Sequence, residues 1–164
     1  MTAREGAVAP PDRHAAEREG RRLALGVIFE ADFGQRAPPR ILERRLIDEG
    51  TTPESAAHAR RLVDAVVRHR DSIDARIAAV ASAHPVLQMA RIDRALLRSA
   101  MGELLHCPTT PARVAISEWV ELARTYSGEP ARRLLNGVLG RVAKEAAGPG
   151  QEARGAGRGP EGGP

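Results

Sequence analysis

Apolar residues recur every three or four positions along most of the chain, and this spacing predicts amphipathic helices. The first predicted helix covers about residues 12–32, with Leu23, Val27 and Ile28 on one face. Asp12 precedes it, and a short acidic side chain there typically caps the free amide groups of a helix N-terminus. No segment has the alternation of polar and apolar residues that predicts a strand.

The same spacing predicts further helices, divided by short segments that contain glycine or proline: 39–49, 52–67, 72–83, 86–106 and a pair within 114–142. The third helix has the clearest start. Thr52 is a good cap, Pro53 suits the first helical position and Glu54 complements the positive end of the helix dipole. Seven helices with short connections predict an all-α bundle.

The helical pair within 114–142 contains unusual polar and small residues beside an ordinary apolar stripe. Gly128 and Pro130 separate its two helices. Asn136 and Gly137 lie in the middle of the second helix although both are poor helix formers. We therefore expect Gly137 to allow close helix approach, and Asn136 to form a hydrogen bond at a helix contact or near a ligand.

Composition sets the domain organisation and the compartment. A single domain over 12–146 is predicted, whereas segments 1–11 and 147–164 have the composition of disordered chain. Cys107 is the only cysteine, which excludes an intramolecular disulfide and favours a reducing compartment. There is neither an apolar run of about 20 residues nor a signal-peptide pattern. A cytoplasmic protein with no membrane segment is expected.

The formal net charge of +4 favours an anionic partner such as nucleic acid, anionic lipid or an acidic protein. Lys144 is the only lysine, so arginine supplies nearly all the positive charge, and we expect most of these arginines to be solvated. Only four aromatic residues are present, which argues against a sheet-type RNA reader that stacks several bases.

No catalytic motif is visible in the sequence. It lacks a glycine-rich phosphate loop, its five histidines are dispersed, and His106-Cys107 has no further ligands at metal spacing. Its carboxylates lie among arginines, and we expect them to form ion pairs at the surface. These observations favour a binding module without cofactor or metal over an enzyme.

Three sequence blocks resemble the NusB family of bacterial transcription antitermination factors. They are RRLALGVIFEAD (21–32), RIDRALLRSAMGELLH (91–106), and VAISEWVELAR (114–124) followed by LLNGVLGRV (134–142). The last pair is similar to the family patterns V-A-I-N-E-A-V-E-L-A-K and F-V-N-G-V-L. In this chain Ser117 replaces the family's asparagine, Trp119 a small residue and Leu134 a common phenylalanine.

The resemblance implies two packed helical subdomains and no catalysis. It also implies binding to the boxA element of nascent RNA, mainly rRNA leader transcripts. The partner implied is NusE, a small-subunit ribosomal protein that doubles as a transcription factor. Together they would join a larger complex on RNA polymerase that suppresses termination.

The resemblance also indicates which residues would bind. RNA contacts are expected from an arginine-rich N-terminal segment, an aromatic residue and the last helix: Arg13, Arg18, Arg21, Arg22, Phe29, Arg132, Arg133 and Asn136. Arginine suits this task because it bonds phosphate through two donors and stacks on bases. Glu17 and Glu19 lie among the N-terminal arginines and should weaken phosphate binding. Asp93 aligns with an acidic position on the protein-binding face.

Two alternatives stay open from the sequence. The chain could be a self-associating helical RNA-binding module, since some NusB-like proteins form a homodimer. It could also be a NusB-like fragment related to rRNA cytosine methyltransferases, in which such a domain occurs at the front. Binding of S-adenosylmethionine would separate the second alternative from an antitermination factor.

Overall fold

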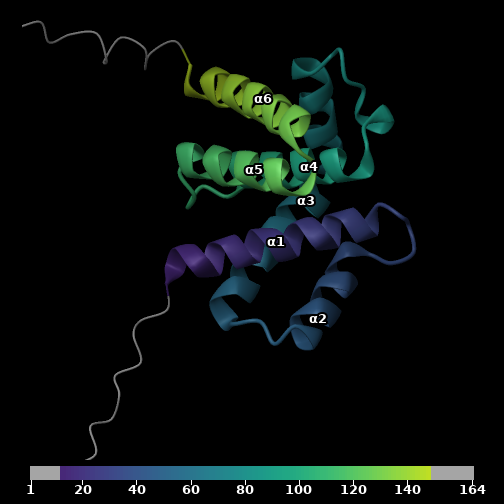
Figure 1. Ribbon diagram of the computed structural model, residues 1–164, viewed down its shortest axis with the longest axis vertical. Helices are drawn as coiled ribbons and strands as arrows, with labels where there is room; N and C mark the ends of the chain where they lie inside the picture. The colour runs from purple at the N-terminus through teal and green to yellow at the C-terminus, as the bar shows by residue number, and fades with distance from the viewer. Residues whose placement is uncertain (1–11, 149–164) are drawn as a thin grey trace, which may run out of the picture.

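The computed structural model describes residues 12–148, and this part of the chain contains α-helices, one 3₁₀ turn and no strand (Figure 1). The elements are α1 (Arg13–Ala31), α2 (Pro38–Asp48), α3 (Pro53–Val80), η1 (Val86–Gln88), α4 (Arg91–His106), α5 (Ala112–Tyr126) and α6 (Glu129–Ala147). The predicted all-α class is therefore confirmed. None of the helices within 12–148 has the length and apolar character needed to cross a membrane.

Both predicted helix caps are present. The Asp12 carboxylate accepts hydrogen bonds from the amides of His14 and Ala15, at 3.0 and 3.4 Å. Thr52 Oγ1 accepts one from the amide of Ser55 at 3.3 Å, and Pro53 occupies the first helical position. These side chains satisfy amides that have no partner within the helix, which fixes where α1 and α3 begin.

The number of helices differs from the prediction. The expected helices over 52–67 and 72–83 form one element, α3, with a kink at His69 where φ is −116° and ψ is 17°. The expected helix over 86–106 begins only at Arg91, preceded by the single turn η1. Residues 12–148 thus contain six α-helices instead of seven, because no proline or glycine lies between the two halves of α3 to end the helix.

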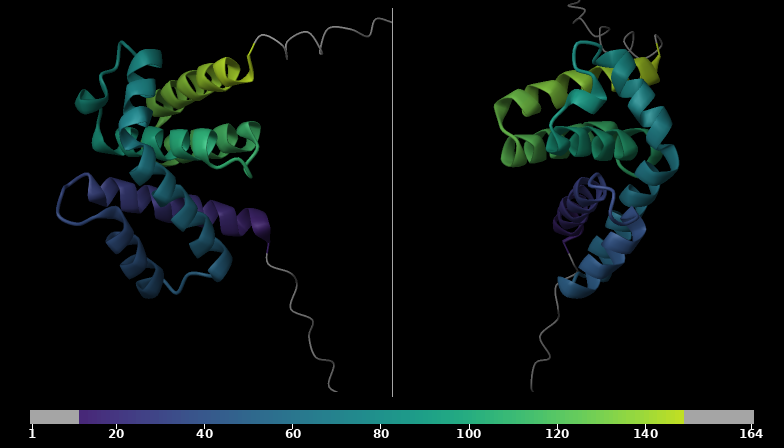
Figure 2. Two further views of the ribbon diagram at one scale, coloured as in Figure 1. Left: turned by 180° about the vertical axis from the view of Figure 1, so that it is seen from behind. Right: turned by 90° about the vertical axis from the view of Figure 1, so that its right-hand side faces the viewer.

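The helices form two packed subdomains that share α3. α1 and α2 pack against α3, and α4 packs against both α3 and α1. α5 packs mainly against α6 and α4, and α6 also contacts α3 (Figure 2). The core joins both groups, and all six helices contribute large, fully buried apolar side chains to it, among them Leu23, Ile41, Leu62, Leu96, Trp119 and Leu139. This arrangement agrees with the expected pair of subdomains.

Glycines allow close helix crossings at two places that the sequence did not indicate. A Cβ atom on Gly20 of α1 would lie 2.8 Å from Cβ of His58, and one on Gly102 of α4 would lie 2.9 Å from Cγ2 of Val66. The expectation for Gly137 is wrong, because a Cβ atom there would meet nothing within 4 Å. Gly137 is exposed and plays no part in helix packing.

Candidate nucleic-acid interface

Arg21, one of the arginines expected to contact RNA, is a core residue. Only 1% of its surface is exposed. Its Nη2 and Nε donate to Oε1 and Oε2 of Glu103 at 2.7 and 2.9 Å. The side chain points between the subdomains because Arg21 shares the inner face of α1 with Ala24, Leu25 and Ile28. The structure thus opposes a direct RNA contact by Arg21.

Glu103 is also an exception to the expectation that carboxylates lie at the surface, since none of it is exposed. Besides Arg21, Trp119 Nε1 donates to Oε2 at 2.6 Å, and His58 Nε2 lies 3.3 Å from Oε1. Burial alone would raise the pKa of Glu103. The opposite effect is larger: hydrogen bonds from His58, Arg21 and Trp119, together with the charge of Arg21, lower the pKa to about 2. The cluster joins α1, α3, α4 and α5 through one ionised group.

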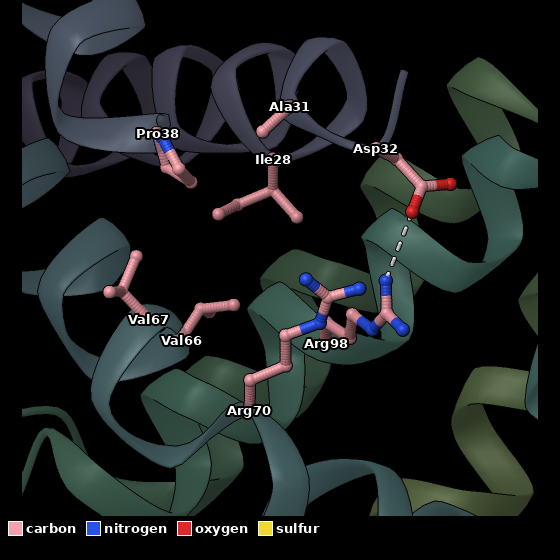
Figure 3. Close-up of a pocket in the computed structure, with 8 residues that line it drawn as sticks. All are labelled: Ile28, Ala31, Asp32, Pro38, Val66, Val67, Arg70 and Arg98. Carbon is pink, nitrogen blue, oxygen red and sulfur yellow. Dashed lines mark hydrogen bonds and ion pairs between the residues drawn. The ribbon is translucent and has the colours of Figure 1, made fainter. Parts of the chain in front are cut away.

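A second ionic network links the end of α1 to α4 and α3. Asp32 accepts hydrogen bonds from Arg94 and Arg98, and Arg98 also donates to both Asp74 oxygens at 2.8 Å. Burial opposes ionisation of Asp32, yet its arginine partners lower its pKa. Asp32 and Arg98 border an apolar cavity of about 170 Å³ between α1 and α3 (Figure 3). Both arginines are mostly buried and serve the fold.

The other N-terminal arginines reach the surface, but each is already held by carboxylates. The side chain of Arg13 is 78% exposed and pairs with Glu17 at 2.9 Å. Arg18, 67% exposed, donates its Nε to both Glu118 oxygens of α5 at 3.2 Å.

Arg22 bonds Glu19 of α1 and Glu49 at the end of α2, at 2.6 and 2.7 Å. The hydrogen bonds that Arg22 donates to Glu19 and Glu49 raise the pKa of Arg22, and its bond to Glu19 lowers the pKa of Glu19. Phosphate would have to compete with these partners for the α1 arginines.

Phe29 is partly buried against the core. Its ring meets that of Phe33 edge to face, with centroids 5.5 Å apart. Its outer edge lines a pocket of about 240 Å³ together with Ile92 and Tyr126. Phe29 is therefore accessible from this pocket while also packing in the core.

The predicted residues of α6 lie apart from those of α1, because α5 runs between these two helices (Figure 1). Arg132 pairs with Glu129 at 2.9 Å. The Arg133 side chain is 73% exposed and its Nε lies 4.0 Å from the same carboxylate. Asn136 is exposed. The structure thus brings Arg132, Arg133 and Asn136 onto one helix but does not join them to the N-terminal arginines.

Asp93, expected on a protein-binding face, lies at the start of α4 and accepts a hydrogen bond from Ser127 Oγ at 2.5 Å. Ser127 follows the last residue of α5, so this bond ties the α5–α6 turn to α4. The neighbouring Ile92 lines the pocket that Phe29 and Tyr126 share. Asp93 does not itself line that pocket, but its partner Ser127 directly follows Tyr126, which does.

Three residues of these polar clusters were not identified from the sequence: Glu49 and Glu118, which pair with arginines, and Trp119, which donates to Glu103. Glu49 and Glu118 are distant from Arg22 and Arg18 in the chain, and no local spacing predicts those pairs. Trp119 has a local signal, because Ala115 and Ala123 flank it at four-residue spacing on the buried face of α5.

Residues 12–148 contain no group of three or more histidine, cysteine or acidic side chains that could hold a metal ion. Cys107, beside His106, is buried. Burial and the nearby Glu103 raise the pKa of Cys107 to about 11, so its thiol is protonated at neutral pH. His106 stacks instead on His69, with ring centroids 3.6 Å apart.

Comparisons of the sequence with family models and with known proteins point to the same family. Residues 18–144 match the model of the NusB family. The transcription antitermination protein NusB of Dehalococcoides mccartyi (strain ATCC BAA-2266 / KCTC 15142 / 195) is 39% identical over 132 residues, which cover 80% of this chain and 92% of that protein. The transcription antitermination protein NusB of Salinispora arenicola is 42% identical over 134 residues, which cover 80% of this chain and 97% of that protein.

Solved structures with the same fold include NusB of T. maritima, at a TM-score of 0.73 and 30% identity, covering 79% of this chain and 91% of that one. A chain from the crystal structure of antitermination factors NusB and NusE in complex with dsRNA also has a TM-score of 0.73. The match covers 80% of this chain and 98% of that chain at 23% identity. The TM-score shows that the two chains share a fold. The family match and the sequence identities agree: the chain belongs to the NusB family.

Proposed function

We propose that this chain is a transcription antitermination factor that binds boxA-like single-stranded RNA of rRNA leader transcripts together with NusE. The observation that carries this proposal is family membership over residues 18–144, with about 40% identity to proteins named transcription antitermination protein NusB. Its site of action is the cytoplasmic RNA polymerase complex, where it suppresses termination.

The ion pairs around α1 support the need for a partner. Arg13, Arg18 and Arg22 each have a carboxylate within 3.2 Å, so their attraction for phosphate is partly cancelled in the isolated chain. Exposed ion pairs are worth only about 0–1 kcal/mol and can exchange for phosphate. A second RNA-binding protein held beside the chain supplies the affinity that the isolated chain lacks.

A transcription assay tests the proposed function. Purified RNA polymerase transcribes a terminator placed behind a leader with a boxA-like element, in the presence of NusE and the other antitermination factors. Addition of this chain should increase read-through on that template but not on one whose element is scrambled. Equal read-through on both templates, with and without the chain, would refute the proposal.

A further inference from the structure

The arginines around α6 share fewer carboxylates than the arginines around α1. Around α1, six arginines form ion pairs with an equal number of carboxylates: Arg13, Arg18, Arg21, Arg22, Arg44 and Arg45 with Glu17, Glu19, Glu30, Glu49, Glu103 and Glu118. Around α6, four arginines share two carboxylates: Arg76, Arg132, Arg133 and Arg141 with Glu129 and Glu145. The network at the end of α1 adds Arg91, Arg94 and Arg98 with Asp32 and Asp74. Even with this network counted, the ion-paired groups at α6 keep the larger positive excess.

A groove of about 350 Å³ runs along this basic side of α6. One wall is the α6 face with Arg133, Gly137 and Arg141, and the other is the segment 81–84 that follows α3. α6 lies beside this end of α3 (Figure 2). No carboxylate lines the groove, whereas the groove between α1 and α5 is lined by both Glu118 and Glu121.

The two exposed arginines of the groove are well placed for an extended polyanion. Arg133 and Arg141 are eight residues apart on one face of α6, which separates them by about 12 Å along the helix. Their side chains are 73% and 61% exposed. They can therefore bind separate phosphates of one strand. His84 and Ser82 in the opposite wall add groups that can form hydrogen bonds.

Gly137 gives an independent reason to regard this groove as functional. It lies between the two arginines, in the middle of a helix, where glycine lowers helix stability. Packing does not require it, since nothing lies within 4 Å of the position of a Cβ atom. Its absent side chain leaves the groove open. Val80, Leu134 and Val138 supply apolar contacts suited to an unstacked base.

We propose that the groove between α6 and segment 81–84 binds single-stranded RNA, with Arg133 and Arg141 on its phosphates and Gly137 leaving room for the strand. The inference rests on the proposed function and extends it. It adds Arg141, Gly137, Ser82 and His84 to the RNA surface, and it places the main phosphate contacts on α6 instead of α1.

The test measures binding of the chain–NusE complex to a labelled boxA-like RNA by fluorescence anisotropy over a range of salt concentrations. The double variant R133Q/R141Q should bind about tenfold more weakly, because charge-assisted hydrogen bonds to phosphate are lost. Its logarithmic salt slope should fall by about 1.4, at roughly 0.7 for each phosphate contact. The variant G137L should weaken binding with an unchanged slope, since it fills the groove without altering charge.

The matched control R60Q/R68Q removes two exposed arginines of α3, whose partners are Glu43 and Asp64. It should change RNA affinity less than twofold. Circular dichroism verifies that R133Q/R141Q is folded. If the wild type binds the RNA and this variant binds it with the same affinity and salt slope, the groove proposal is overturned. Failure of the wild type to bind the RNA would instead refute the proposed function.

Discussion

The guanidinium of Arg21 and the carboxylate of Glu103 face each other in the interior, where they form a two-point ion pair between α1 and α4. Trp119 and His58 complete the surroundings of the carboxylate from α5 and α3. Helices from both subdomains thus converge on one buried charge. Burying such a pair costs desolvation free energy. Removing one charge and removing both charges should therefore have different effects on stability.

Removing one member of the pair should destabilise the fold strongly. The variant E103L leaves the Arg21 guanidinium buried without its partner, and we expect a loss of about 3–5 kcal/mol in the free energy of unfolding. The double variant R21M/E103L removes both charges and should recover most of this loss. Urea denaturation followed by Trp119 fluorescence measures both. A double variant less stable than E103L would contradict this account.

Acid should remove the stabilisation that Glu103 provides. The pKa of Glu103 is about 2 in the folded chain, below the ordinary value of 4.5, so its contribution is complete above pH 4.5 and is lost as the pH falls towards 2. A difference of about 2.5 pH units corresponds to stability on the order of 3 kcal/mol.

Urea denaturation at several pH values checks this expectation. The wild type should lose more stability than E103Q between pH 5 and pH 3, because glutamine cannot take up the proton. Equal losses of unfolding free energy in both proteins would show that carboxylates other than Glu103 cause the destabilisation by acid.

Three mid-helix glycines should respond differently to substitution by alanine. G20A and G102A place a Cβ atom 2.8 and 2.9 Å from His58 and Val66, and we expect each to cost about 1–3 kcal/mol. G137A meets no neighbour and should stabilise the fold by about 0.5–1 kcal/mol, since alanine favours helix. Thermal denaturation of the three variants separates them, and destabilisation by G137A would contradict the assignment of Gly137 to an open groove.

Releasing an α1 arginine from its carboxylate should strengthen RNA binding by the isolated chain. In E118Q the Arg18 guanidinium keeps its exposed position but loses its charged partner. We expect RNA affinity to rise about two- to fivefold at low salt, an effect that screening removes at high salt. The control variant is E43Q. It removes the carboxylate of Glu43 on α2, which forms a similar exposed ion pair with Arg60 on α3. An equal rise in both variants would indicate a general charge effect instead of a local one.

The sequence predicted the helical class, the caps at Asp12 and Thr52 and the general positions of the helices, because these depend on local spacing and local hydrogen bonds. It did not predict that α3 is continuous, since a kink at His69 looks like a helix end when only the apolar pattern is considered. His69, at the kink, stacks on His106 of α4, a tertiary contact that local propensity does not include.

The candidate site was predicted less well because arginines on one helix differ by the face they occupy. Arg21 stands beside Arg22 in the sequence, yet Arg21 shares a face with Ala24 and Ile28 and is buried. Helical periodicity could have separated the two. The pairs Arg18–Glu118 and Arg22–Glu49 could not be found this way, because they join residues on different helices.

Equilibrium binding of a boxA-like RNA, with and without NusE, tests the central claim most directly. Anisotropy should show tighter binding to this RNA than to its scrambled counterpart, and NusE should increase the preference. By linkage, the RNA should raise the affinity for NusE by the same factor. Equal affinity for both RNAs in the presence and absence of NusE would contradict the account.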